Sequence, residues 1–196
     1  VYTVLQQRMR LDAAVQTLLR GKLEKLQPVV LDILRLGAAQ ILFFDKVPDS
    51  AAVNEAVRQA RRYANPRAAG LVNGLLRNLS RQKAQMPEPK TLSVRYSCPE
   101  PLLQLLRRSV GEENLEALLQ SQNEAPPMTI QVNTLKISAQ ALEAQLAADG
   151  VAAHRHAWCP DCLVLSGSGN LEHLEAFRAG LCYVQDPAAK MAVLAA

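Results

Sequence analysis

Large apolar residues recur at helical spacing throughout the first half of the chain. Apolar positions three and four residues apart are typical of an amphipathic helix, and four such segments follow one another. Gly21, residues 45–48 and residues 65–66 separate the helices, and Asp49 or Ser50 is expected to cap the third. The positions expected to face a common core are Leu5, Leu11, Val15, Leu18, Leu19, Val30, Leu34, Ala38, Ile41, Leu42, Val53, Ala56, Val57, Ala60, Tyr63, Ala68, Leu71, Val72, Leu75, Leu76 and Leu79.

Two glycines and two asparagines within these helices carry more specific expectations. Gly70 and Gly74 lie four residues apart and predict a close helix contact, since a helical glycine otherwise costs about 1 kcal/mol relative to alanine. Asn54 and Asn73 each follow an inward-facing valine, at the flank of an apolar face. Both amides are therefore expected to be partly buried and to make structural hydrogen bonds.

The second half changes to shorter segments and to alternating patterns. Residues 86–89 read as a proline-punctuated linker, followed by two short helices joined at Gly111. After residues 126–127 the order of elements is βαββαβ, which is the ferredoxin-like arrangement. The predicted fold class is thus α+β, a helical bundle followed by a small βαββαβ domain. Its expected elements are a strand at 128–132, a helix at 138–148 capped by Ser138, strands at 151–156 and 162–165, a helix around 171–177 and a strand at 181–184.

Composition narrows the class of protein. Apolar residues make up 49% and charged residues 20% of the 196 positions, which excludes wholesale disorder. No apolar run approaches the roughly 20 residues of a membrane span, and no secretory signal opens the chain. With four cysteines and no disulfide-scaffold pattern, a cytoplasmic setting is expected.

The charge is distributed unevenly along the chain. Residues 1–90 hold 15 Lys and Arg against 7 Asp and Glu, so the net charge of +4 combines +8 there with −4 in residues 91–196. The polar faces of the third and fourth helices are arginine-rich and have few acidic neighbours one turn away. Such a face can bind phosphate or can simply solubilise the bundle, and charge alone leaves both open.

The segment around the Cys159-x-x-Cys162 motif offers two further chemistries. His154, His156, Cys159 and Cys162 could together satisfy a tetrahedral Zn²⁺ ion, although their spacing is unusually tight. Redox catalysis is disfavoured because a strand, rather than a helix N-terminus, is expected to follow the motif. The plain alternative is a hairpin turn with incidental thiols, and Cys98 and Cys182 are expected to be buried hydrophobic residues.

The first half resembles the RNA-binding domain of the NusB antitermination factor. The resemblance rests on the sequence LRLGAAQIL at 34–42, DKVP at 45–48, AAVNEAV at 51–57 and PRAAGLVNGLLR at 66–77. It implies an all-helical RNA-binding bundle whose first helices precede residue 1.

The whole chain is similar to the Fmu/Sun family of 16S rRNA (cytosine-5) methyltransferases, which begin with a NusB-like domain. The second half carries this resemblance through YSCPEPL at 96–102, QVNTLK at 131–136 and GLCYVQDPAA at 180–189. The family usually has arginine where Gln131 stands in this sequence. The resemblance implies rRNA, 16S in particular, as partner and S-adenosylmethionine as cofactor of a catalytic domain beyond residue 196. The residues expected to bind RNA are Arg58, Arg61, Arg62, Arg67, Arg77, Arg81 and Lys136.

Four regions and three functional hypotheses follow. The expected regions are a NusB-like domain (1–85), a linker with short helices (86–127), a ferredoxin-like domain (128–186) and the start of the methyltransferase domain (187–196). No glycine-rich cofactor loop occurs, so no catalytic or cofactor-binding residue is expected within the chain, although its parent would be an enzyme. The alternatives are a non-enzymatic RNA-binding factor of the antitermination type and a structural fragment without affinity for RNA.

Overall fold

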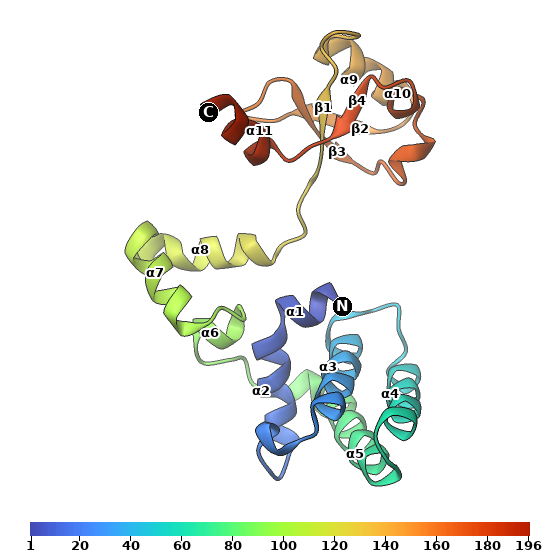
Figure 1. Ribbon diagram of the computed structural model, residues 1–196, viewed down its shortest axis with the longest axis vertical. Coiled ribbons are helices and arrows are strands. Elements are labelled where there is room, and N and C mark those ends of the chain that lie inside the picture. Colours follow the sequence, from blue (N-terminus) through green and yellow to red (C-terminus); the bar gives the residue numbers. More distant parts are fainter. The chain divides into compact units, whose positions relative to one another are not determined.

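All strands lie in the second of two units of the computed structural model, which describes residues 1–196 (Figure 1). The helical unit comprises residues 1–124 and the sheet unit residues 125–196, so the predicted linker helices belong with the bundle. No helix is long and apolar enough to cross a membrane. The helices of the helical unit are α1 (Tyr2–Gln6), α2 (Arg8–Leu18), α3 (Pro28–Phe43), α4 (Asp49–Tyr63), α5 (Pro66–Gln82), α6 (Leu92–Arg95), α7 (Glu100–Val110) and α8 (Glu112–Asn123), with short 3₁₀ turns η1 (Leu23–Lys25) and η2 (Lys83–Gln85).

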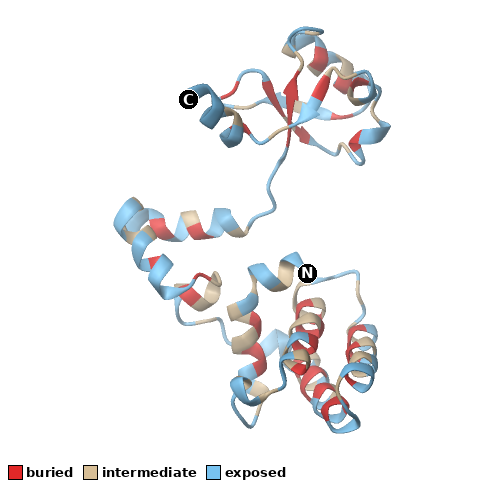
Figure 2. Ribbon diagram, viewed as in Figure 1, coloured by how far each residue is buried: buried red, intermediate tan, exposed pale blue.

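The core of the bundle depends on one close helix approach, at Gly37 of α3. A Cβ atom there would lie 2.5 Å from Cδ1 of Leu76 and 3.4 Å from Cβ of Ala56, so the glycine leaves space for the Leu76 side chain. Leu34 and Leu76 are almost completely buried, and Figure 2 shows buried positions along α3 and α5. The apolar pattern of the sequence therefore predicted this core well.

The close contact expected at Gly70 and Gly74 is wrong. Nothing lies within 4 Å of a Cβ atom placed on either glycine, and both are exposed on α5. The neighbouring Leu71 is correspondingly 37% exposed rather than buried. A glycine pair at this spacing fits an open helix surface as well as a contact, and the sequence does not separate the two.

Three further local expectations need correction. Leu5 and Tyr63 are 66% and 60% exposed, because each lies near a helix end, beyond the packed part of the bundle. The N-cap of α4 is Pro48, without a side-chain hydrogen bond, and Asp49 is the first helical residue. Its carboxylate instead accepts hydrogen bonds from Ser80 Oγ at 2.7 Å and Lys83 Nζ at 2.9 Å. Asn65, by contrast, caps α5 by accepting from the Ala68 N–H.

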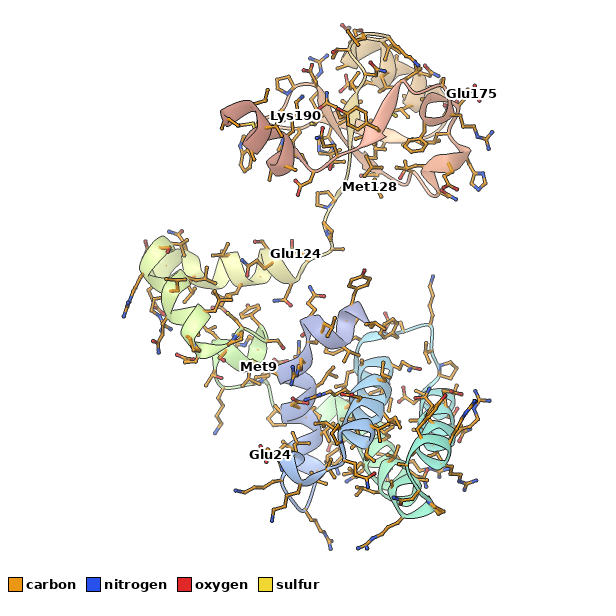
Figure 3. The ribbon with its side chains drawn as sticks, in the orientation of Figure 1. Met9, Glu24, Glu124, Met128, Glu175 and Lys190 are labelled. Carbon is orange, nitrogen blue, oxygen red and sulfur yellow. The ribbon has the colours of Figure 1, made fainter.

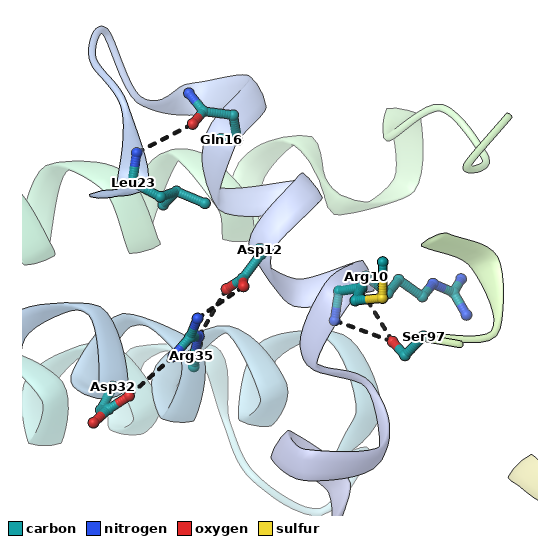
Figure 4. Close-up of polar contacts among 8 residues, drawn as sticks. Arg10, Asp12, Gln16, Leu23, Asp32, Arg35 and Ser97 are labelled. Atoms are coloured by element: carbon teal, nitrogen blue, oxygen red, sulfur yellow. Dashed lines mark hydrogen bonds and ion pairs between the residues drawn. The ribbon is translucent and has the colours of Figure 1, made fainter. Parts of the chain in front are cut away.

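A residue distant in sequence caps the start of α2. The N–H groups of Met9 and Arg10 donate to Ser97 Oγ at 3.1 and 3.3 Å (Figure 4). These donors lie in the first helical turn, where no intrahelical acceptor exists. Ser97 itself has a positive φ of 52°, and Asn123 at the end of α8 accepts a hydrogen bond from Gln7. The segment before α7 is thereby fixed to the bundle.

The sheet unit has the predicted βαββαβ order. Its strands are β1 (Met128–Val132), β2 (Ala152–Arg155), β3 (Cys162–Ser166) and β4 (Cys182–Val184), antiparallel in the order β2-β3-β1-β4. Ser138 caps α9 (Ala139–Ala148) as expected, and η3 (Leu171–His173) with α10 (Glu175–Arg178) supplies the second helical segment. Ile130 and Leu163 lie in the buried core with residues of α9. A final helix, α11 (Pro187–Ala195), ends the chain.

We expect the two kinds of helical glycine to respond oppositely to alanine. Gly74→Ala should stabilise the protein by about 0.5–1 kcal/mol, because the site is open and alanine favours the helix. Gly37→Ala should destabilise it by about 1–3 kcal/mol, because the methyl group overlaps Leu76 in a packed core. Urea unfolding of both variants beside the parent chain measures the difference, and a stabilised Gly37→Ala would contradict the packing of α3 against α5.

Candidate nucleic-acid interface

The outer faces of α4 and α5 carry the six arginines singled out from the sequence. The pattern on each helix explains this, because the buried positions of α4 and α5 form one stripe and the arginines fall outside it. In Figure 3, long nitrogen-tipped side chains project outward from both helices. All six are exposed: Arg58, Arg61, Arg62, Arg67, Arg77 and Arg81. We call this set the arginine face.

The arginine face consists of two groups at opposite ends of the helix pair. Arg58, Arg61 and Arg62 lie in the last turns of α4, and Arg67 lies in the first turn of α5, across the Asn65 turn. Arg77 and Arg81 lie near the other end of α5. At about 1.5 Å rise per residue, the fourteen positions from Arg67 to Arg81 span roughly 21 Å.

Few acidic groups compete for these guanidinium groups. Arg58 pairs with Glu55 one turn away, and Arg77 Nε donates to Asn73 Oδ1 at 2.9 Å. The Arg62 guanidinium lies 5.3 Å from the centre of the Tyr63 ring. Of the six arginines, only Arg58 forms a salt bridge. Exposed ion pairs are worth at most about 1 kcal/mol, so the whole face is available to an anionic ligand.

A cleft between the start of α4 and the end of α5 adjoins the second arginine group. Its volume is about 400 Å³, and we call it the α4–α5 cleft. The hydrogen bond from Ser80, together with Lys83, holds the pKa of Asp49 below its usual value. The carboxylate thus stays charged and fastens the two helix ends together. The lining residues are Asp49, Ser50, Val53, Asn54, Arg77, Ser80 and Arg81.

The structure does not support the hydrogen-bonded role expected of Asn54. Its side chain is exposed, lines the α4–α5 cleft and makes no side-chain hydrogen bond within the protein. Asn73 is partly buried as expected, but its bond to Arg77 lies within α5 and does not join two helices. In a helix each residue is rotated by about 100° from the one before it. Asn54 therefore points away from the helix contact that Val53 makes, and its side chain is exposed to solvent.

Sequence reasoning missed the groups that hold the cleft together. Asp49 and Ser80 are 31 residues apart, and Lys83 lies in η2, beyond the end of α5. No periodicity or motif links these positions. Only the antiparallel packing of α4 against α5, once known, brings the start of one helix to the end of the other.

Lys136 belongs to the sheet unit and not to the arginine face. It lies in the segment after β1 and is exposed, but its Nζ donates to the backbone oxygen of Ala179 at 2.8 Å. This hydrogen bond joins the segment after β1 to the segment just before β4, and the Lys136 side chain is otherwise exposed to solvent.

The four candidate metal ligands do not form a metal site. No group of three or more His, Cys, Asp or Glu side chains is placed to hold an ion. Cys159 and Cys162 are buried at either end of a turn closed by the Cys162 N–H to Cys159 O bond of 2.8 Å, and burial raises the pKa of Cys162. His154 is exposed, and His156 Nδ1 accepts from the Trp158 N–H. The hairpin turn expected here is confirmed, as are the buried Cys98 and Cys182.

Gln131, where the sequence resemblance leads one to expect arginine, is an internal residue. It is 6% exposed, its Nε2 donates to the Val132 carbonyl, and its Oε1 accepts from the Cys162 thiol at 3.2 Å. The glutamine therefore completes a small polar cluster on the sheet and leaves the sheet unit without a phosphate ligand at this position.

Comparison with known families assigns each half of the chain. Residues 1–81 match the NusB family, and residues 98–172 match the family described as "Methyltr_RsmF/B-like, ferredoxin-like domain". The chain is a NusB-like domain followed by a methyltransferase-type ferredoxin-like domain. Together the two matches support the resemblance to the N-terminal region of the Fmu/Sun family that the sequence motifs indicated.

Relatives along the full chain agree with this assignment. The chain is 32% identical to ribosomal RNA small subunit methyltransferase B of Vibrio cholerae and 31% identical to the probable enzyme of that name from Synechocystis. The alignments cover 98% and 97% of this chain but 44% of each relative, so the chain spans less than half of their length. A crystal structure of PH0851, at 22% identity, shares the fold over 99% of this chain and 44% of its own, with a TM-score of 0.70.

The contribution of Asp49 to stability should depend on pH. Its pKa is lower in the folded protein than in the unfolded chain, so the stabilisation is complete at neutral pH and is lost as the pH falls below about 4. Ser80→Ala removes the larger of the two causes and should raise the pKa of Asp49. Carboxyl NMR titration of the parent chain and the variant measures this shift, and an identical titration in both would contradict it.

Removal of the Asn54 amide should leave stability almost unchanged. Asn54→Ala deletes no hydrogen bond and fills no buried space, so we expect a change within about 0.5 kcal/mol. Asn65→Ala is the matched comparison, because it removes a real N-cap and should cost about 1 kcal/mol. Thermal melting of the two variants distinguishes them. A destabilised Asn54→Ala would contradict this prediction and support a structural role for the Asn54 amide.

Proposed function

We propose that this chain is the RNA-positioning portion of an S-adenosylmethionine-dependent rRNA (cytosine-5) methyltransferase that acts in the cytoplasm. In this proposal the arginine face docks 16S rRNA, and a catalytic domain of the same protein, beyond residue 196, performs the chemistry. The observation that carries the proposal is the pairing of a NusB-like and a ferredoxin-like domain, found in relatives named as small subunit rRNA methyltransferases.

The electrostatics of the helical unit favour this role. Each phosphate neutralised by an arginine releases counterions, so a face with six guanidinium groups supplies sequence-independent affinity for RNA. Because the arginines project from two helices with a common core, their spacing is fixed before RNA arrives. The face thus orients a structured RNA without reading its sequence, and selection of one cytosine falls to the catalytic domain.

The residues present here do not fit the methyl-donor cofactor. Gly167 and Gly169 follow β3 in a loop with positive φ angles, and the next element is the short 3₁₀ turn η3. A phosphate- or cofactor-binding glycine loop instead connects a parallel strand to the N-terminus of a long helix. In our proposal S-adenosylmethionine is therefore held entirely by the catalytic domain.

A non-enzymatic factor of the antitermination type is the competing function. The NusB-like bundle by itself is equally compatible with an antitermination factor and with a methyltransferase. The ferredoxin-like domain has no role in such a factor, whereas it accompanies the bundle in the methyltransferase relatives. The pairing of the two domains therefore favours the methyltransferase.

The double variant Arg61→Ala/Arg62→Ala tests the RNA-binding role of the arginine face. We expect weaker binding of a 16S rRNA fragment, and a log–log salt slope reduced by about 0.7 for each single-strand phosphate that the variant no longer neutralises. Lys22→Ala/Lys25→Ala removes the same charge from exposed positions outside the face and should alter binding far less. Fluorescence anisotropy at several salt concentrations provides both numbers. Equal affinities and slopes in the parent and the arginine variant would refute the assignment.

A further inference from the structure

A second, larger and more apolar cleft lies in the helical unit, between α2, the end of α3 and the segment that follows α5. Its volume is about 690 Å³, within the range of roughly 300–1,000 Å³ typical of small-ligand sites. We call it the α2–η2 cleft. Its walls are mainly apolar, and they include Leu42, Phe43, Met86, Pro89 and Val94.

Three cations surround this apolar space. Arg10, Lys83 and Lys90 line the cleft, against a single carboxylate, Glu88. Arg10 lies 3.7 Å from Glu88, and its guanidinium carbon lies 5.5 Å from the centre of the Phe43 ring. Lys90 is exposed and forms no salt bridge. The cleft therefore combines apolar and aromatic lining with an excess of positively charged side chains.

The α2–η2 cleft continues from the arginine face. Lys83 lines it, and the same ammonium group bonds to Asp49, which lines the α4–α5 cleft together with Arg77 and Arg81. A polynucleotide that follows the arginines along α5 thus reaches the α2–η2 cleft at the end of that helix. A paired segment presents only sugar and phosphate outward, whereas an unpaired nucleotide exposes both faces of its base.

We propose that the α2–η2 cleft receives one unpaired nucleotide of the bound RNA. The base lies against the Phe43 and Arg10 side of the cleft, and the flanking phosphates contact Lys83 and Lys90. This proposal rests on the RNA-binding function proposed above and adds to it a preference for RNA with a single-stranded segment beside a helix. It needs no particular base, because stacking and charge accept any of the four.

Three RNA ligands test the proposal with the 196-residue chain. They are a blunt duplex, the same duplex with a short single-stranded overhang, and that duplex with the overhang built from abasic nucleotides. We expect the natural overhang to bind at least about fivefold more tightly than the abasic one, because one stacked base contributes about that much. The abasic overhang carries the same phosphates, so this comparison isolates the base.

Variants locate the effect. Lys90→Ala should reduce the advantage of the natural overhang over the blunt duplex, whereas Lys22→Ala, with the same loss of charge at an exposed site outside both clefts, should preserve it. An advantage that depends on the base but is the same in Lys90→Ala as in the parent chain would overturn the placement in this cleft.

The remaining outcomes separate this proposal from the proposed function. Similar, salt-dependent affinities for all three RNAs would overturn the nucleotide site, while RNA binding by the arginine face would still stand. The occupant of the α2–η2 cleft would then be a peptide or a small molecule. Failure of the chain to bind any of the three would overturn both.

Discussion

The space that Gly37 leaves for Leu76 determines how close α3 and α5 lie, and the helical unit depends on that distance. Ala56 of α4 borders the same space, so three helices meet where only small side chains fit. Close-packed interiors respond to even one added methylene group. With the inner faces filled by apolar side chains in this way, the arginines of α4 and α5 must project into solvent, and the arginine face is the consequence.

Polar side-chain contacts then join the helices to one another beside the apolar core. Arg35 Nε and Nη2 donate to the two carboxylate oxygens of Asp12, which joins α3 to α2, and this pairing raises the pKa of Arg35 (Figure 4). Asp49 and Ser80 do the same for α4 and α5. Ser97 caps α2 across 88 positions of sequence. The Ser97 contact also satisfies two backbone N–H groups that the start of α2 would otherwise leave unpaired.

The sequence predicts the features that follow from local hydrophobic periodicity, and it does not predict contacts between residues that are distant along the chain. The core positions at Leu34 and Leu76, the βαββαβ order and the cap at Ser138 all follow from local patterns, and the structure confirms them. No pattern marks Gly37, and the prediction of a close contact at Gly70 and Gly74 is wrong, because spacing along one helix does not reveal what lies opposite. The clefts beside α5 are likewise formed by residues that only the fold brings together, and the assignment of RNA contacts stays a prediction.

Most acidic residues of the helical unit that form ion pairs pair with cations outside the arginine face. The positive charge of that face is therefore greater than the net charge of the chain indicates. Asp12 and Asp32 are both bonded to Arg35, and Asp49 is bonded to Ser80 and Lys83. Glu55 is then the only carboxylate on α4 and α5 that pairs with a member of the arginine face. Because solvent ions screen exposed charges beyond about 8 Å at physiological salt, an approaching phosphate responds to the nearest groups rather than to the total. Because the other carboxylates are engaged elsewhere in the bundle, Glu55 alone pairs with the arginine face, which remains a cationic surface.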